Sequence, residues 1–531
     1  MDSIADHLSW KPWLTLPTVL VLGVFLFRRI NLIYQLRHIR GPLLYRLTGI
    51  PHSLALLSGD SHNWYAELHR KYGEVVVVSP SMVITSSPEL WMRSNTYPGY
   101  KKSSWFYKAV RYDYREDTLF TQTDTEKHDL RRKQMIRGYS GIENLTLDND
   151  VEVCVVKLLK LIRTRYAGQR KAMDLAEKTH FFTMDVISTI GFGKCYNLLT
   201  RDADPEGYIE SLHAGLAVAH RQVAFGTWRL NWIPFLGPRP KRDPDSNTGF
   251  YKMSMLNSAM VEAREKEFRE QDSLETAPRQ DMLTSFMKRG LLGADLKTEN
   301  TLQIVAGSDT TSGAFNGVLL YVLTNPICYK KLQAEIDDAV VSGNAPQAPE
   351  VITYAQARDL PYLQTVIMEG LRMFPPVNNQ NSRDVPPEGD TVSIGGEEVF
   401  LPGGSMVIPS YVAMHQNKRV YGDIDVDVFR PERWTEETDE AKLAAMRHEV
   451  NLGFGHGRWL CLGKLIALHE LSVVTFELFR HFDWRIVNPE KPWKHTLLMG
   501  LHAVSDMWVH VEERKKPEQS QGPDNLVTDL A

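Results

Sequence analysis

One cysteine of this chain lies in a glycine-rich loop that leads directly into a helical pattern, and this feature constrains the fold most strongly. The segment reads Phe454-Gly-His-Gly-Arg-Trp-Leu-Cys-Leu-Gly463, with three glycines around Cys461. Glycine allows a backbone to approach a flat ligand closely, and amides at a helix N-terminus stabilise a thiolate. The loop therefore predicts that Cys461 is a thiolate ligand. A buried structural cysteine beside a glycine turn is the alternative that the loop alone leaves open.

The composition and the other cysteines narrow the class of protein. The chain has 531 residues, a formal net charge of -4 and 43% hydrophobic residues, which is typical of a globular protein. The near-neutral charge argues against a dedicated nucleic-acid binder. The four cysteines lie far apart without a CxxC pair, which argues against a zinc site built on thiolates and fits a reducing compartment. They are Cys154, Cys195, Cys328 and Cys461.

The N-terminal segment has the pattern of a membrane anchor. Pro12–Phe27 is uncharged and mostly apolar, and Arg28 and Arg29 follow it. Spanning a bilayer takes ~20 residues, so the helix must continue toward residue 36. Because basic residues follow the run, the positive-inside rule predicts a single-pass anchor with a cytoplasmic body. A cleaved signal peptide is the alternative, but it needs a basic start, whereas Asp2 and Asp6 precede the run.

The periodicity of the remaining chain predicts a mainly α fold with small β-sheets. Glu74–Val78 and Met82–Thr85 have the pattern of a hairpin, and so do Thr391–Ile394 and Val399–Leu401 around a Gly-Gly turn. Helical patterns dominate between residues 126 and 340 and return after Gly463.

The Cys461 loop resembles the cysteine loop of the cytochrome P450 superfamily, FxxGxRxCxG. Phe454, Gly457, Cys461 and Gly463 match this pattern, but Trp459 stands where the family has an arginine that contacts a haem propionate. Arg458 stands one place earlier, so it either reaches the propionate by another path or faces solvent. The GRWxCLGK form is similar to membrane-bound (microsomal, class II) fungal members such as the pisatin demethylase group. The resemblance implies the cytochrome P450 fold and haem b with an axial thiolate.

Two further motifs resemble the family's structural core. Glu369-Gly-Leu-Arg372 matches its ExxR on a helix, where residues three apart share a face. Phe429-Arg-Pro-Glu-Arg-Trp434 follows about 60 residues later and resembles the PERF motif. The resemblance implies that Arg433 joins Glu369 and Arg372 in a buried triad with a structural role.

A fourth motif, Ala306-Gly-Ser-Asp-Thr-Thr311, lies in a helical run from about Leu296 to Asn325. It matches the family's (A/G)Gx(D/E)T(T/S) on the long helix that crosses the haem. The resemblance implies that Ala306 leaves room for dioxygen and substrate, that Thr310 hydrogen-bonds dioxygen and that Asp309 delivers protons. A helix with a polar kink is the alternative.

Arginines suit the two haem propionates because a guanidinium binds a carboxylate in bidentate geometry. His128-Asp-Leu-Arg-Arg132 resembles the family's WxxxR helix, with His128 in the place of the tryptophan and Arg132 matching the arginine. Arg383 matches the arginine of the strand after ExxR. Each of the two arginines has a surface cation as its alternative role.

The chain has no nucleotide-binding fingerprint of its own, so its electrons must come from another protein. The resemblance implies an NADPH-dependent flavoprotein reductase, with cytochrome b5 as a further partner, at the endoplasmic reticulum membrane. An acidic flavoprotein could dock on a basic cluster near Arg132, although a solvated basic face is an equal alternative. The cluster consists of Lys127, Arg131, Lys133 and Arg137.

These patterns divide the chain into five parts. We predict a lumenal stub at 1–11, the membrane anchor at 12–36, a basic and Pro-containing hinge at 37–50, a haem-thiolate monooxygenase domain at 51–513 and a polar tail at 514–531.

Aromatic and polar segments near the expected cavity indicate a largely apolar small-molecule substrate with a few polar handles. They are Tyr100–Thr123, Phe225–Phe235 and Asn378–Asn381. The resemblance implies oxygen insertion into a terpenoid, polyketide or alkaloid of fungal secondary metabolism. Two alternatives remain: an isomerase or dehydratase that needs no dioxygen, and a membrane-tethered haem sensor without catalytic activity.

Overall fold

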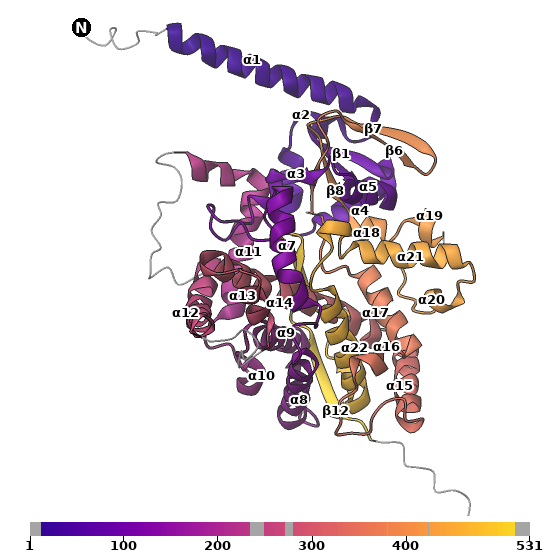
Figure 1. The fold of residues 1–531 in the computed structure, drawn as a ribbon. Coiled ribbons are helices and arrows are strands. Elements are labelled where there is room, and N and C mark those ends of the chain that lie inside the picture. The colour runs from indigo at the N-terminus through magenta and orange to yellow at the C-terminus, as the bar shows by residue number, and fades with distance from the viewer. Residues whose placement is uncertain (1–11, 234–248, 271–279, 380, 423, 516–531) are drawn as a thin grey trace, which may run out of the picture.

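The computed structural model describes residues 12–233, 249–270, 280–379, 381–422 and 424–515 (Figure 1). Helices form most of the body, and the larger sheet with β1 and β8 lies at the end of the body near α1. The longer helices are α1 (Pro12–Gln35), α4 (Ser61–Tyr72), α5 (Pro88–Thr96), α7 (Thr125–Tyr139), α8 (Leu147–Arg165), α9 (Leu175–Phe192), α11 (Tyr208–Phe225), α12 (Gly249–Arg269), α14 (Gly293–Leu323), α15 (Pro326–Val341), α17 (Pro361–Met373), α21 (Glu440–Leu452) and α22 (Lys464–His481).

Shorter helices and 3-10 turns connect these elements. They are η2 (Leu36–His38), α2 (Leu43–Leu47), α3 (Ile50–Leu57), α6 (Ser104–Tyr107), α10 (Leu198–Arg201), η3 (Thr227–Trp232), α13 (Met282–Lys288), α16 (Tyr354–Arg358), α18 (Tyr411–Met414), α19 (Lys418–Tyr421), α20 (Arg433–Glu436) and η5 (Gly457–Trp459).

The strands form one larger sheet and three small ones. The five-stranded sheet has the order β1-β2-β8-β5-β3, in which β2 and β8 are parallel and the other pairs are antiparallel. The others are β4-β12-β9 and the hairpins β6-β7 and β10-β11. The bounds are β1 (Val75–Ser79), β2 (Met82–Thr85), β3 (Lys101–Lys102), β4 (Met173–Asp174), β5 (Arg383–Asp384), β6 (Asp390–Ile394), β7 (Glu397–Leu401), β8 (Met406–Pro409), β9 (Phe482–Ile486), β10 (Lys494–Leu498), β11 (Leu501–Ser505) and β12 (Trp508–Glu513).

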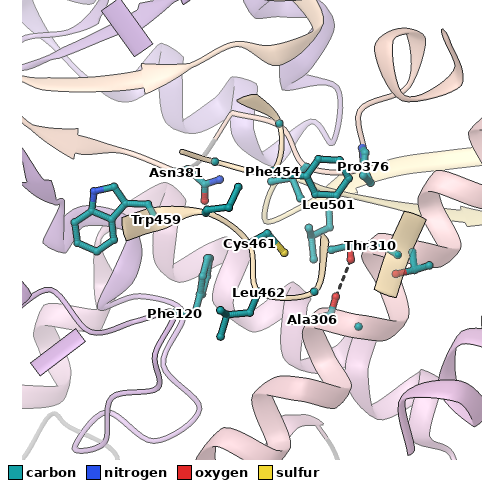
Figure 2. Close-up of a pocket in the computed structure, with 18 of the residues that line it drawn as sticks. Phe120, Ala306, Thr310, Pro376, Asn381, Phe454, Trp459, Cys461, Leu462 and Leu501 are labelled. Atoms are coloured by element: carbon teal, nitrogen blue, oxygen red, sulfur yellow. Dashed lines mark hydrogen bonds between the residues drawn. The ribbon is translucent and has the colours of Figure 1, made fainter. Parts of the chain in front are cut away.

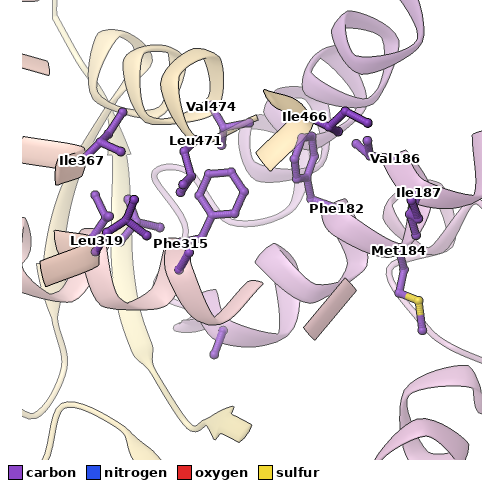
Figure 3. Packing of buried hydrophobic residues seen from close by; sticks show 14 of the residues in the cluster. Phe182, Met184, Val186, Ile187, Phe315, Leu319, Ile367, Ile466, Leu471 and Val474 are labelled. Carbon is purple, nitrogen blue, oxygen red and sulfur yellow. The ribbon is translucent and has the colours of Figure 1, made fainter. Parts of the chain in front are cut away.

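The core forms around α14, which packs against α9, α17 and α22 (Figure 3). Phe315 of α14 is fully buried and lies edge-to-face with Phe182 of α9 at a centroid distance of 5.8 Å. Closer to the cavity, Gly307 allows α9 to approach, because a Cβ at this position would lie 2.8 Å from the Ile187 side chain. This close packing fixes the long helix against its neighbours, so side chains on its other face are held in position.

The structure confirms the predicted mainly α fold and both hairpins. β1 pairs with β2 and β6 with β7, each within one residue of the predicted bounds except that β7 begins two residues earlier. The helical run predicted from Leu296 to Asn325 is α14, and the helix predicted after Gly463 is α22.

The predicted anchor coincides with a helix, but its membrane span is not confirmed. α1 covers Pro12–Gln35 and extends away from the body in Figure 1. Among the residues that the structure describes, every helix falls short of the combined length and apolar character that crossing a bilayer requires. The predicted stub at 1–11 and the tail beyond residue 515 lie outside the described residues.

Candidate active site

Cys461 lies in a tight loop between η5 and the start of α22. Its backbone N–H donates to the carbonyl of Phe454 at 2.7 Å, which closes the loop. Gly455 has φ +78, and a Cβ there would lie 2.4 Å from the Trp459 carbonyl, so this turn requires glycine. The sulfur opens into a cavity deep inside the protein. Burial raises the pKa of the Cys461 thiol, while the Gly463 amide and the charge of Arg132 act in the opposite direction.

The cavity extends from Cys461 to α14 and has a volume of about 310 Å³ (Figure 2). Ala306 and Thr310 line it from α14, and the Thr310 hydroxyl donates to the Ala306 carbonyl at 2.7 Å. Most of the remaining lining is apolar, including Phe120 and Leu501. The predicted loop residues Phe454 and Gly463 also line the cavity, whereas Gly457 does not.

Asp309 is adjacent to Thr310 in the chain but faces another part of the molecule. Its carboxylate lies 3.1 Å from Nε2 of His180 on α9 and 3.4 Å from Nε2 of His213 on α11. Burial acts to raise the pKa of Asp309, yet the two imidazoles outweigh burial and hold the pKa below its ordinary value. The predicted acid is therefore ionised and held by two histidines that the sequence patterns do not indicate.

Three cations line the cavity without forming an ion pair with any residue that the structure describes. Lys102, Arg132 and Arg383 line it, and none forms an ion pair with a carboxylate in the part of the chain that the structure describes. Arg383 is 3% exposed, and its Nε has no hydrogen-bond partner there. Burial, followed by the charge of Arg383, lowers the pKa of Lys102 well below its ordinary value. Such an arrangement is stable only when anions bind to it.

Lys102 is a site residue that the sequence patterns did not reveal. Its Nζ donates to the carbonyls of Leu119 and Phe120 at 3.0 and 2.8 Å. Lys101, its neighbour on β3, is exposed, because successive side chains of a strand face opposite sides. The sequence does not indicate which of these two consecutive lysines is buried. The structure distinguishes them, because only Lys102 faces the cavity.

Trp459 lies among these cations, in the position where the resemblance places an arginine. The Lys102 ammonium is 4.9 Å and the Arg383 guanidinium 5.2 Å from the centre of its ring. The centre of the His128 ring is 4.4 Å from the centre of the indole. The π-face of the Trp459 indole thus contacts two cations. Lys102 brings to this place a positive charge, which an arginine at position 459 would otherwise supply.

Arg458 does not contribute to this group. Its guanidinium pairs with Asp129 at 3.2 Å, its side chain is 41% exposed, and it does not line the cavity. The structure therefore places Arg458 on the solvent side, which is one of the two alternatives stated above. Arg132, in contrast, reaches the cysteine loop, because its Nη1 donates to the Leu460 carbonyl at 2.6 Å.

The residues around this cavity fit a haem. The cavity offers a sulfur ligand at Cys461 and apolar walls for a porphyrin. The buried Lys102 and Arg383 and the half-buried Arg132 form a cation group suited to two propionates. The Nε of Arg383 has no acceptor among the described residues and can donate to such an anion. The position of the sulfur, the apolar walls and the unpaired cations thus all favour a haem as the ligand of this cavity.

The structure also brings the three residues of the predicted triad together. Glu369 accepts from Nε and Nη2 of Arg372 at 2.8 Å each and from Nε of Arg433 at 2.8 Å. The indole N–H of Trp434 donates to the same carboxylate at 3.0 Å. These side chains are almost fully buried, so the triad joins α17 to the segment that precedes the cysteine loop.

Comparisons with known proteins agree with this geometry. A family model described as Cytochrome P450 matches residues 40–506. The cytochrome P450 monooxygenase ABA1 of Pyricularia oryzae is 33% identical over 534 residues, covering 97% of this chain and 99% of that protein. The monooxygenase aba1 of Botryotinia fuckeliana is 31% identical, covering 87% and 88%. The monooxygenase abl1 of Leptosphaeria maculans is 30% identical, covering 94% and 87%.

Proposed function

The chain belongs to the cytochrome P450 family, and from this premise we propose that it oxidises a small, largely apolar molecule in the Cys461 cavity. The protein is a haem-thiolate monooxygenase. Haem b, supplied with electrons from NADPH through a reductase, provides the dioxygen chemistry that inserts one oxygen atom into the substrate. The observation that carries the proposal is that Cys461 and Thr310 line one buried cavity from two different elements.

Different residues in and beside the cavity bind the cofactor, hydrogen-bond dioxygen and deliver protons. Cys461 would hold the haem through its sulfur, and the cation group would bind the propionates. The Thr310 hydroxyl would donate a hydrogen bond to dioxygen. To do so, it must rotate away from the Ala306 carbonyl that accepts its hydrogen bond in this structure. Asp309 supplies protons toward Thr310, and His180 and His213 keep its carboxylate ionised between turnovers.

The lining supports a substrate that is mostly apolar with few polar groups. Phe120, Leu302 and Leu501 contribute apolar walls, and Gln303 and Asn381 contribute amides. The Gln303 Oε1 is buried without a hydrogen-bond partner, so it is available to a substrate hydroxyl. A terpenoid, polyketide or alkaloid of fungal secondary metabolism has this chemistry, and the fungal relatives support that setting.

An NADPH-dependent reductase, and cytochrome b5 in addition, are the proposed electron donors, and α7 is their proposed docking face. Lys127 and Lys133 are exposed on α7. Arg131 instead pairs with Asp295 and Glu299, and Arg137 pairs with Glu143, so the two lysines are the cations of the predicted cluster left for an acidic partner.

We place the protein at the endoplasmic reticulum membrane, attached in a single pass by α1, with the catalytic body on the cytoplasmic side. Large apolar side chains on α1 are exposed, and Arg28 and Arg29 follow its apolar part. The exposed side chains include Val19, Leu20 and Phe27. Membrane fractionation of the full chain beside a chain that begins after residue 36 tests this placement. Equal release of both chains by buffer alone would contradict it.

The enzymatic proposal is tested by turnover with reductase, NADPH and a panel of candidate metabolites under heavy-isotope dioxygen. We expect one labelled oxygen atom in the product. We also expect Thr310→Ala to consume NADPH while releasing hydrogen peroxide, because the hydroxyl at the cavity is lost. Thr324→Ala is the matched control, since Thr324 makes the same bond to the carbonyl four residues earlier but lies outside the cavity. Product formation without consumption of dioxygen would instead support an isomerase or dehydratase.

A further inference from the structure

Three side chains of metal-ligand type meet on the side of α14 that faces away from the Cys461 cavity. His180 comes from α9, His213 from α11 and Asp309 from α14. One ligand atom of each lies within 4.8 Å of those of the other two. α9 packs directly against α14, and α12 packs against both α11 and α14, so the three groups are brought together by regular helices and not by a loop.

One of the two distances in this cluster matches the edge of a tetrahedral metal site, and the other is about 0.2 Å shorter. Zinc binds imidazole nitrogen and carboxylate oxygen at about 2.0–2.2 Å, which separates neighbouring ligand atoms by about 3.3–3.6 Å. Oδ1 of Asp309 lies 3.1 Å from Nε2 of His180 and 3.4 Å from Nε2 of His213. The two imidazole rings lie 5.5 Å apart at 47°, so they do not stack on each other.

His180 provides a second, independent observation. Its residue is 6% exposed, and its Nε2 has no hydrogen-bond partner in the part of the chain that the structure describes, although Oδ1 of Asp309 is only 3.1 Å away. The nitrogen is therefore close to the carboxylate but poorly aligned for a hydrogen bond to it. A buried nitrogen without a hydrogen bond is costly, and a shared cation would satisfy it together with the carboxylate.

We propose that His180, His213 and Asp309 bind a single divalent transition-metal ion of the zinc class. Two imidazoles and one carboxylate are a common ligand set for this ion, with water as the fourth ligand. The side chain of His213 is 33% exposed, so it gives the ion and the water a path from solvent. The ion cancels the charge of Asp309, which is 6% exposed.

A second histidine cluster, made of His62, His495 and His502, fits an ion less well. It contains no carboxylate, and the Asn378 amide nitrogen lies 2.9 Å from Nε2 of His502, which occupies that ring nitrogen. His495 is exposed. This cluster therefore serves as the matched control for the first one.

A bound ion would restrain the reaction. It would hold the Asp309 carboxylate on the side of His180 and His213 and prevent it from carrying protons toward Thr310. This consequence rests on the proposed function, because it assumes that Asp309 delivers protons. The binding site itself does not depend on that assumption, so the two are tested separately.

Binding is measured by calorimetric titration of the haem-loaded full chain with zinc chloride in a buffer that does not chelate metals. We expect one tight site. His213→Asn and His180→Asn should each weaken it by at least about 100-fold, since loss of a mere outer-shell partner costs about 10–100-fold. His495→Asn should leave the affinity unchanged. A thiolate-type spectrum of the reduced carbonyl complex shows that each variant is folded.

X-ray absorption at the zinc edge provides the second measurement. We expect two imidazole nitrogens and further oxygen ligands at about 2.0–2.2 Å. The proposal is overturned if His495→Asn abolishes binding while His213→Asn retains it, or if the wild-type chain binds no zinc more tightly than the His180→Asn, His213→Asn double variant. Zinc that binds with this pattern supports the site. If such binding leaves the yield of product per NADPH unchanged, the site stands and the proton-delivery role of Asp309 fails.

Discussion

Two buried charge clusters of this protein differ in whether they contain their own counter-charge. In the triad, one carboxylate, Glu369, accepts hydrogen bonds from both guanidinium groups and from an indole. In the cation group, Lys102 and Arg383 lie over the Trp459 ring and Arg132 donates to the adjacent Leu460 carbonyl, and none of the three forms an ion pair with a carboxylate among the described residues. The first cluster is complete in the protein alone, whereas the second is completed by a ligand.

This difference shows how a structural cluster can be distinguished from a binding cluster. Moving charged groups out of water costs free energy, and in a paired cluster the ion pairs and hydrogen bonds between its members offset that cost. In an unpaired cluster only a bound anion offsets it, so without the anion its residues keep unused donors and shifted pKa values. Here these are the free Nε of Arg383 and the lowered pKa of Lys102.

Of the substitutions considered, removal of the Glu369 carboxylate from the triad should change the free energy of unfolding most. Glu369→Gln leaves Arg372 and Arg433 buried without a counter-charge, and we expect the free energy of unfolding to fall by about 3–5 kcal/mol. Denaturant unfolding of the haem-loaded protein, followed by circular dichroism, measures this loss. Glu436→Gln is the control, because Glu436 pairs with Arg430 at the surface. Equal stability of the two variants would remove the triad from its structural role.

Removing a cation from the unpaired cluster should act on the cofactor and much less on the fold. Lys102→Met loses a charged hydrogen bond to a propionate, worth about 1.5–3 kcal/mol, so we expect haem to dissociate about 10- to 100-fold faster. Haem transfer to an excess of a haem-free acceptor protein measures this rate. Lys101→Met on the same strand should leave it unchanged. If both variants lose haem equally fast, Lys102 does not bind a propionate.

The exchange between Lys102 and Trp459 can be tested by restoring the family's arginine. Trp459→Arg alone places a fourth cation in the group and should speed haem loss through repulsion between like charges. In the Trp459→Arg, Lys102→Met double variant the arginine replaces the lysine, and we expect a favourable coupling of about 0.5–3 kcal/mol. Additive effects of the two substitutions on the haem-transfer rate would show that the two positions do not compensate each other.

The smallest effect concerns a buried pair beside the cation group. Burial raises the pKa of Glu299 to about 7, although Arg131 acts against this shift. The ordinary value is about 4.3, so between pH ~4.3 and ~7 the folded state binds more protons than the unfolded state. The free energy of unfolding should therefore fall as the pH rises through this window.

Glu299→Gln should flatten that pH dependence, because it removes the titrating group. Denaturant midpoints at a series of pH values provide the measurement, and Glu262→Gln at the surface is the control. An unchanged slope in Glu299→Gln would mean that Glu299 already ionises in this range with the help of Arg131, as a fully compensated pair would.

The sequence was sufficient where a function depends on residues that are close together in the chain. The cysteine loop, Glu369 with Arg372, and Ala306 with Thr310 are each contained in a single short segment. The structure places Cys461, Ala306 and Thr310 at one cavity and pairs Glu369 with Arg372. Arg132 and Arg383 also line the cavity, and their contact with the propionates stays a prediction. In these cases local spacing determines the face on which a side chain lies.

The sequence was insufficient where a contact depends on how distant elements pack. His180 and His213 reach Asp309 from two other helices, and no spacing rule links the three positions. Lys102 differs from Lys101 only in the side of a two-residue strand on which it lies. Arg458 stands one position away from the family's arginine, and that single step turns its side chain to solvent. Each of these outcomes is decided by tertiary packing and the direction of the side chain.

The hydrogen bonds of Lys102 also bear on how the protein matures after synthesis. The same ammonium that faces the cation group donates to the carbonyls of Leu119 and Phe120, and Phe120 is part of the cavity wall. Burial lowers the pKa of Lys102, so the charge of this ammonium is costly until an anion binds beside it. Arrival of the propionates would stabilise the charge and, with it, the two hydrogen bonds to the wall. Cofactor insertion would thereby also strengthen one side of the substrate cavity.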